Sequence, residues 1–348
     1  MADVAARAGV GAITVSRAIR NPSRVSEALR RQIDEAIHAL DYVPDRAASA
    51  LASRHSSIVA VLIPGLSPNI FTDVLRGIYD GVGDSGLRIE IVNTRYDAQL
   101  EERLVAEILR HQPAGIIISG TEQSAATRKR LEQAGCPVVQ IMDLSDDPIG
   151  TIIGFSHHEA ARRMTAHMIE RGYRRIGFVG GTIAGRSAGR LAGYRAALEE
   201  AGLYDPRLTA VSLRGPAEVE PPEVIDLPMA RIGRERLEML LERAPDLDAV
   251  FCNTDALAIG ALFACHARGI GVGDDLGIAG FNDFDYMEAA EPTLSSVRTH
   301  RWRCGNLAMA AVRDGLAGRK PAVQVVDVGF DIVERRSTAG PALSRRSG

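Results

Sequence analysis

From residue 58 onward, short apolar runs alternate with amphipathic stretches, and the whole series occurs twice along the chain. Alternation of this kind predicts parallel strands joined by crossover helices. The expected strands span residues 58–63, 88–93, 115–119, 137–142, 175–180, 208–213, 249–253 and 276–281. The expected helices span residues 72–84, 99–111, 125–134, 158–171, 190–201, 232–243 and 256–268. Two such series predict two doubly wound parallel sheets, with a ligand cleft between them at the carboxyl ends of the strands.

The first 57 residues show instead the pattern of three short helices. A helix over residues 3–8 is followed by a turn at Gly9 and Gly11, a second helix over about 12–19, and a third that begins after Ser26, a typical N-cap residue. Two helices joined by a glycine-containing turn and braced by a third are typical of a helix-turn-helix, whose second helix enters the major groove of DNA. Three helices that only cap a larger domain would show the same pattern.

The segment after the third helix favours DNA binding over a simple cap. Residues 45–53 are rich in alanine, are preceded by Pro44 and would form about two helical turns. A helix this short is marginal in water on its own, so we expect it to order only when something packs against it. A hinge between a DNA-reading head and a regulated body has this property.

The head and the body also differ in charge. Residues 1–57 hold eight Arg and no Lys against six acidic residues, a net charge of +2, whereas the remainder carries −5. Contact with phosphates requires a positive face rather than a positive total. No apolar run approaches the ~20 residues that span a bilayer, and the first residues lack the pattern of a signal peptide. We therefore expect a cytoplasmic protein with no membrane partner.

Several short motifs in the head and hinge resemble the lactose-repressor (LacI) family of bacterial transcription factors, and the resemblance extends through almost the whole chain. The motifs are Asp3-Val4-Ala5, Ala8-Gly9-Val10, Thr14-Val15-Ser16-Arg17, Val25-Ser26, Leu40-Asp41-Tyr42-Val43-Pro44, Arg46-Ala47-Ala48 and Leu51-Ala52. Two residues depart from the family pattern. Gly11 stands where Ser or Thr caps the second helix, and Asp45 stands where Asn is usual.

The resemblance implies a fold class and a domain organisation. The fold would be a three-helix helix-turn-helix head with a hinge helix, followed by an α/β effector domain like periplasmic binding proteins, built from two doubly wound parallel-sheet subdomains. The head would span residues 1–44, the hinge and linker 45–57, and the effector and dimerisation domain 58–340. The first subdomain would span about 58–156 plus 299–324, and the second about 157–298 plus 325–340.

The resemblance also implies which residues bind DNA. In the family, the positions that match Ala12, Ile13 and Arg17 read bases, and the position that matches Leu51 wedges into the minor groove at the centre of a palindromic operator. Together with their polar neighbours on the second helix and in the hinge, the candidate DNA-binding residues are Ala12, Ile13, Thr14, Ser16, Arg17, Arg20, Arg46 and Leu51.

Polar and aromatic residues gather at the predicted strand ends of the body. Each alone is typical of a helix cap or a loop hydrogen bond, but the resemblance places them in the family's small-molecule site. The candidate effector-binding residues are Phe71, Asp143, Phe155, Arg186, Arg190, Asp255 and Asn282. Phe71 fits the core equally well, and either Arg could instead be solvated or paired with a surface acid such as Glu199.

Within the family, several stretches of the body are most similar to gluconate-operon repressors. They are Val74-Leu75-Arg76-Gly77-Ile78, Met142-Asp143, Gly154-Phe155, His158-Glu159-Ala160-Ala161-Arg162, Phe251-Cys252 and Ile278-Ala279-Gly280-Phe281. A sugar acid also fits the residues, because Arg186 and Arg190 could hold a carboxylate through paired hydrogen bonds. The resemblance favours a repressor released by such an effector, acting as a homodimer because one recognition helix reads only a half-site.

Two other classes of protein share parts of this pattern. A transport protein that only binds a ligand would share the body, and an α/β enzyme would share the sheets, but neither accounts for the head. The literal GxGxxG over residues 81–86 follows an expected helix rather than a strand, so it predicts helix-terminating turns and no dinucleotide site. Four scattered cysteines have no metal-ligand spacing. We expect no catalytic residues, no metal and no cofactor.

Overall fold

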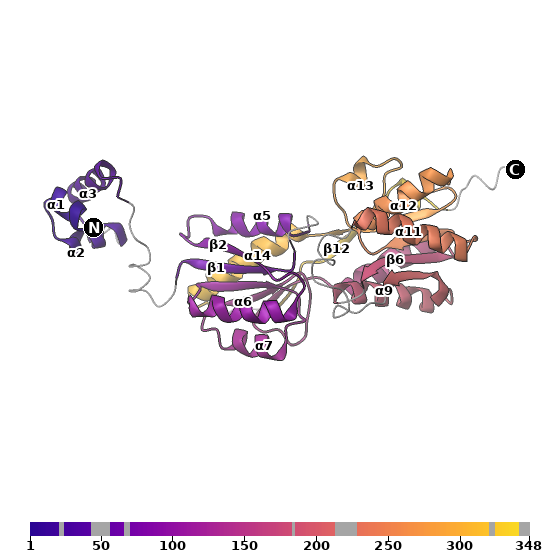
Figure 1. The fold of residues 1–348 in the computed structure, drawn as a ribbon, viewed down its shortest axis with the longest axis horizontal. Helices are drawn as coiled ribbons and strands as arrows, with labels where there is room; N and C mark the ends of the chain where they lie inside the picture. The colour runs from indigo at the N-terminus through magenta and orange to yellow at the C-terminus, as the bar shows by residue number, and fades with distance from the viewer. Residues whose placement is uncertain are drawn as a thin grey trace. The chain divides into compact units, whose positions relative to one another are not determined.

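The computed structural model describes residues 1–20, 24–42, 56–65, 70–182, 185–212, 228–319 and 324–340. The chain divides into two compact units, Met1–Ser56 and Ser57–Gly348. The described residues of the first unit form three helices, and those of the second form two sheets with their covering helices (Figure 1). The expected hinge over residues 45–53, including Arg46 and Leu51, lies outside the described residues.

The first unit is the expected helix-turn-helix of α1 (Ala2–Arg7), α2 (Ala12–Arg20) and α3 (Glu27–Ala39). Gly9 has a φ of 57°, a left-handed conformation that allows the tight turn after α1. Val15 is fully buried, and Ile19 packs on the small core that all three helices share. Ser26 is the N-cap residue of α3 as expected, but its side chain makes no capping hydrogen bond.

The second unit contains two six-stranded sheets, each in its own lobe. The first sheet has the strand order β11-β5-β4-β3-β1-β2, and all of its pairs are parallel. Its strands are β1 (Ile58–Ile63), β2 (Arg88–Asn93), β3 (Gly115–Ser119), β4 (Val138–Ile141), β5 (Thr151–Gly154) and β11 (Val325–Asp327). A sheet with helices on both faces requires apolar residues on both sides of its strands, and five of the six residues of β1 are buried.

Helices cover both faces of the first sheet. On one face, Val59 and Val61 pack with α5 (Ile70–Val82) and α14 (Arg301–Leu316). On the other face, the alternate residues Ala60 and Leu62 pack with α6 (Ala98–Arg110) and α7 (Ala125–Glu132). α14 lies beside α5 although the two are far apart in the sequence (Figure 1). We call this sheet and its four helices the first lobe.

The second lobe repeats this arrangement with the strand order β12-β10-β9-β8-β6-β7, in which only β12 is antiparallel to its neighbour. Its strands are β6 (Ile176–Thr182), β7 (Thr209–Ser212), β8 (Ala249–Cys252), β9 (Gly277–Asn282), β10 (Ser295–Thr299) and β12 (Phe330–Val333). Its helices are α8 (His157–Glu170), α9 (Arg186–Glu200), α11 (Met229–Arg243), α12 (Asp255–Arg268) and α13 (Tyr286–Ala289), with short 3₁₀ helices at Pro206–Leu208 and Arg336–Thr338.

The strands that the alternating pattern predicts are confirmed, and so is the fold class, but the pattern missed the end of the chain. The sequence predicted neither β5 nor the elements β10, α14, β11 and β12, through which the chain crosses between the lobes. β11 pairs with β5 in the first sheet, whereas the expected boundary placed residues 325–340 in the second subdomain. The GxGxxG glycines do end α5, and Gly83 and Gly86 take left-handed conformations before β2.

Candidate functional site

One face of α2 is exposed to solvent. Ala12, Ile13 and Arg17 are exposed, and Ile13 is 76% exposed, an unusual state for so large an apolar side chain. Thr14 and Ser16 are half-buried. Arg20 ends the helix. The candidate DNA-binding residues of α2 therefore lie on a helix whose inner face is fixed by Val15 and Ala18 and whose outer face is open.

The second candidate site surrounds Arg190 on α9, which is 6% exposed. Its Nη1 donates a 2.6 Å hydrogen bond to the carbonyl oxygen of Asn253, and its Nε donates to Nδ1 of His157 at 3.2 Å. The guanidinium lies over the ring of Phe281, 3.7 Å from the centroid. Burial and the nearby Arg186 lower the pKa of Arg190 to about 9. Among the described residues, no carboxylate lies within 4 Å of this cation.

Arg186, one turn earlier on α9, reaches the first lobe. Its Nη1 donates to Oγ of Ser119 at the end of β3, 3.3 Å away, and its guanidinium carbon lies 5.7 Å from the centroid of the Phe71 ring on α5. Gly185, the N-cap residue of α9, has a φ of 50°, and a Cβ there would meet the carboxylate of Glu122. This glycine therefore permits close contact between the two lobes.

Asp143 follows β4, and its carboxyl group is the first lobe's charged side chain beside Arg186 and Arg190. Burial raises the pKa of its carboxyl group, against the opposing effects of a hydrogen bond from the Leu144 amide and of Arg186 and Arg190. Phe155, which follows β5, is buried and packs against the ring of His157 with 4.3 Å between centroids. The structure thus brings Asp143, Arg186 and Arg190 together, and it places Phe155 in the wall beside them.

Asp255 and Asn282 lie at the ends of the neighbouring strands β8 and β9. Asp255 is fully buried, and its two oxygens accept hydrogen bonds from Oγ of Ser296 at 2.6 Å and from the amide of Phe284 at 2.8 Å. Burial raises the pKa of Asp255 to about 6 against these opposing bonds. The carboxylate therefore organises the loop after β9, and its contact with a ligand stays a prediction.

Within the described part of the chain, two buried amide atoms at these strand ends have no hydrogen-bond partner: Oδ1 of Asn253, an acceptor, and Nδ2 of Asn282, a donor. Most buried polar groups in folded proteins are paired, and an unpaired one needs a specific explanation. A donor and an acceptor on adjacent strand ends match what a ligand hydroxyl group can accept and donate. This pair gives the site a polar end distinct from its two cations.

Sequence reasoning missed several residues of this site, namely Ser119, His157, Asn253 and Arg301. Asn253 directly follows β8, so its place at a strand end could have included it among the candidates. The roles of His157 and Arg301 depend on contacts between elements far apart in the chain. In the described part of the protein, no group of three or more His, Cys, Asp or Glu side chains is placed to hold a metal. None of its helices has the length and apolar character that crossing a membrane requires.

Comparisons with known proteins find matches for both units of the chain. Residues 1–45 match the family model of bacterial regulatory proteins of the lacI family, and residues 165–338 match a periplasmic binding protein-like domain. The HTH-type transcriptional regulator GntR of Pseudomonas aeruginosa is 36% identical over 336 residues, 97% of this chain and 94% of the relative.

Two solved structures extend this similarity to three dimensions. The transcription regulator GntR from Chromobacterium violaceum is 37% identical, covers 81% of this chain and 100% of its own, and superposes with a TM-score of 0.75. A LacI-family transcriptional regulator from Silicibacter pomeroyi is 32% identical, covers 97% of this chain and 98% of its own, and has a TM-score of 0.85. These relatives are named regulators rather than enzymes, which confirms the preference for a regulator over an α/β enzyme. The chain belongs to the LacI family of bacterial regulatory proteins and is a DNA-binding transcriptional regulator.

Proposed function

We propose that this regulator is a repressor of genes for sugar-acid catabolism. As a homodimer in the cytoplasm it binds a palindromic operator, and it leaves the operator when a small sugar acid such as gluconate binds between the two lobes. The proposed effector contacts are Asp143, Arg186, Arg190, Asp255 and Asn282, with Phe71 and Phe155 as apolar walls.

The observation that carries the effector class is the buried cation of Arg190. A buried charge without a directly bonded opposite charge is costly. Among the described residues, Arg190 is held by a carbonyl oxygen, a neutral imidazole and an aromatic face, and the carboxylates of Asp143 and Asp255 act on it only from a longer distance. A ligand carboxylate would supply a directly bonded negative charge, because Arg recognises carboxylates through two parallel hydrogen bonds. Arg186, at the same end of α9, could share that carboxylate.

The unpaired amide atoms of Asn253 and Asn282 support an effector that also carries hydroxyl groups. Hydroxyl groups on a chain attached to the carboxylate would donate a hydrogen bond to Oδ1 of Asn253 and accept one from Nδ2 of Asn282. An aliphatic acid without hydroxyl groups would leave both atoms unpaired, at a cost of ~1–3 kcal/mol for each. The site therefore favours a hydroxy acid over a simple carboxylate.

For DNA, the proposal assigns base reading to Ala12, Ile13 and Arg17, with Thr14, Ser16, Arg20 and Arg46 as phosphate or sugar contacts and Leu51 as the minor-groove wedge. Two heads would read half-sites about one helical turn apart. Release requires only that the effector favour one arrangement of the lobes, with a coupling of typically ~1–3 kcal/mol.

A binding assay tests the proposal as a whole. Duplexes that the purified protein retains from a random pool give the operator, and fluorescence anisotropy then measures its affinity with and without D-gluconate, D-glucitol and D-glucose. We expect a palindromic site and a five- to 150-fold loss of operator affinity with gluconate alone. Equal affinity for the operator and a scrambled duplex would overturn the DNA assignment. A response to glucose and glucitol equal to that for gluconate would overturn the sugar-acid assignment.

A further inference from the structure

Arg301 connects the two lobes beside the proposed effector site. It is the first residue of α14, in the first lobe, and it is 7% exposed. Its Nη1 donates to the carbonyl oxygen of Asn282, at the end of β9 in the second lobe, and to Oγ1 of Thr299 at 2.9 Å. Its guanidinium carbon lies 4.7 Å from the centroid of the Phe284 ring. One side chain of the first lobe therefore holds the ligand-facing loop of the second.

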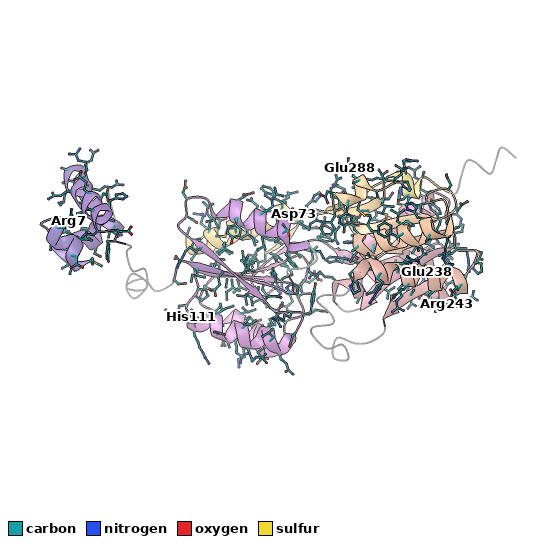
Figure 2. The ribbon with its side chains drawn as sticks, turned by 45° about the horizontal axis from the view of Figure 1, so that its top comes forward. Arg7, Asp73, His111, Glu238, Arg243 and Glu288 are labelled. Atoms are coloured by element: carbon teal, nitrogen blue, oxygen red, sulfur yellow. The ribbon has the colours of Figure 1, made fainter. Side chains whose placement is uncertain are left out.

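Asp73 fixes the direction of this side chain from within the first lobe. Its Oδ2 accepts hydrogen bonds from Nη2 and Nε of Arg301, at 2.9 and 3.2 Å, although the two residues are 228 positions apart. Asp73 lies in the first turn of α5, at the end of the first lobe that faces the second (Figure 2). Its other oxygen pairs with Arg76, an exposed residue on the same helix.

The helices that carry Asp73 and Arg301 form one rigid block. A Cβ at Gly77 of α5 would meet the backbone of Trp302, and a Cβ at Gly305 of α14 would meet the backbone of Val74. The two helices therefore touch through their glycines, and this close packing keeps Asp73 beside Arg301. A motion of one lobe against the other would instead change the contact between Arg301 and the loop after β9.

That loop has a backbone that needs support. Asn282 and Asp283 have φ values of 120° and 56°, which L-residues rarely adopt. Arg301 bonds to the Asn282 carbonyl oxygen, the Asp283 amide donates to Oγ of Ser296, and the Phe284 amide donates to Oδ2 of Asp255. The Asp283 carboxylate also pairs with Arg298 and Arg335. Of these partners, only Arg301 belongs to the first lobe.

We propose that Arg301, oriented by Asp73, is a positioning residue that sets the Asn282 side chain for the effector and links occupancy of the site to the arrangement of the lobes. A ligand that pairs with the Asn282 amide would move the loop against Arg301 and so against the first lobe. The link to operator release rests on the proposed function, whereas the positioning of the loop by Arg301 does not.

The first test uses hydrogen exchange on the full chain without ligand, and it compares Asp73→Asn with the matched control Arg76→Gln. Asp73→Asn weakens the bond that orients Arg301, whereas Arg76→Gln removes only the exposed partner of the same carboxylate. In Asp73→Asn we expect the Asp283 and Phe284 amides to exchange at least fivefold faster, while amides within α5 and α14 change less than twofold. In Arg76→Gln all of these amides should stay within twofold. Unchanged loop exchange in Asp73→Asn, or an equal increase throughout both helices, overturns the positioning role.

The second test measures operator affinity with and without D-gluconate. In Asp73→Asn we expect the ratio of the two affinities to fall at least fivefold at saturating gluconate, with saturation established by calorimetry on the DNA-free protein. Arg301→Lys should reduce the ratio further, and Arg76→Gln should retain it. A full ratio in Asp73→Asn overturns the link to release. A wild-type protein that does not bind gluconate counts against the proposed effector, and the exchange experiment still decides the role of Arg301.

Discussion

Arg190 donates a hydrogen bond from Nε to Nδ1 of His157, and this bond fixes the state of the imidazole ring. A guanidinium can only donate, so Nδ1 must be the unprotonated nitrogen, and the ring proton lies on Nε2. Nε2 in turn donates to the carbonyl oxygen of Met142, 2.9 Å away, at the end of the first lobe's β4. Burial, reinforced by Arg190 and Arg186, holds the pKa of His157 well below its usual value.

Because His157 is neutral, the positive charge of Arg190 beside it stays available to a ligand. A protonated imidazole would repel Arg190, and a carboxylate in the same position would neutralise it. The neutral ring instead orients the guanidinium without cancelling its charge. Arg190 therefore keeps a net positive charge inside the protein, directed by His157 and by the Asn253 carbonyl oxygen.

The first prediction concerns this charge. Arg190→Gln should lose gluconate affinity by about 10- to 100-fold, because a hydrogen bond to a charged group contributes ~1.5–3 kcal/mol. Affinity for D-glucitol, which carries a hydroxymethyl group in place of the carboxylate, should change less than threefold. Arg195→Gln, an exposed position on the same helix, is the control. Isothermal titration measures all three proteins, and an equal loss for both ligands in Arg190→Gln would contradict carboxylate recognition.

The second prediction concerns pH and Asp255, whose pKa burial raises to about 6 from 3.8. The folded state then holds the proton more tightly than the unfolded state. The carboxyl group contributes stability below pH ~4 and loses it as the pH rises to ~6. A shift of about two units corresponds to ~3 kcal/mol. Urea unfolding of the wild type and of Asp255→Asn should therefore show the wild type losing about 3 kcal/mol relative to the variant between pH 4 and 7. Parallel curves would contradict the raised pKa.

The third prediction concerns base reading by α2. Arg17→Ala should lower operator affinity by ~1–3 kcal/mol and reduce the preference for the operator over a scrambled duplex. Arg31→Ala, which removes an exposed Arg from α3, is the control and should leave that preference unchanged. Anisotropy titrations at one fixed salt concentration measure both variants. A proportional loss on both duplexes in Arg17→Ala would assign the residue to phosphates instead of bases.

The fourth prediction concerns the independence of the head. Ile33 is fully buried in the core that α1, α2 and α3 share. Ile33→Ala should destabilise the head by ~2–5 kcal/mol. Calorimetry should show a head transition that moves to lower temperature, while the transition of residues 57–348 stays in place. Ile13→Ala should leave both transitions unchanged and weaken operator binding, because Ile13 is 76% exposed. A shift of both transitions in Ile33→Ala would show that the units unfold together.

Local sequence pattern was sufficient for most of the fold. β1 and β3 begin and end at the predicted residues, because strands buried on both faces appear as continuous apolar runs bounded by turn residues. β2, at the edge of its sheet, also has its predicted bounds, although none of its residues is buried. The helices of the head follow equally from their spacing of apolar residues. The strand-end rule also found Asp143, Arg190 and Asn282, since the carboxyl ends of parallel strands and the loops after them meet on one side of a sheet.

Sequence pattern alone did not determine how those residues are used. The crossover elements β10, α14, β11 and β12 have no repeat to reveal them, and only the folded chain joins Asp73 to Arg301. Likewise, only the folded structure shows that no carboxylate of the described residues bonds directly to Arg190, whereas the oxygens of Asp255 already have partners. The sequence determined the elements, because propensity and periodicity act over a few residues. The tertiary structure decided the partners and protonation states, because these depend on which distant groups exclude water and share a hydrogen bond.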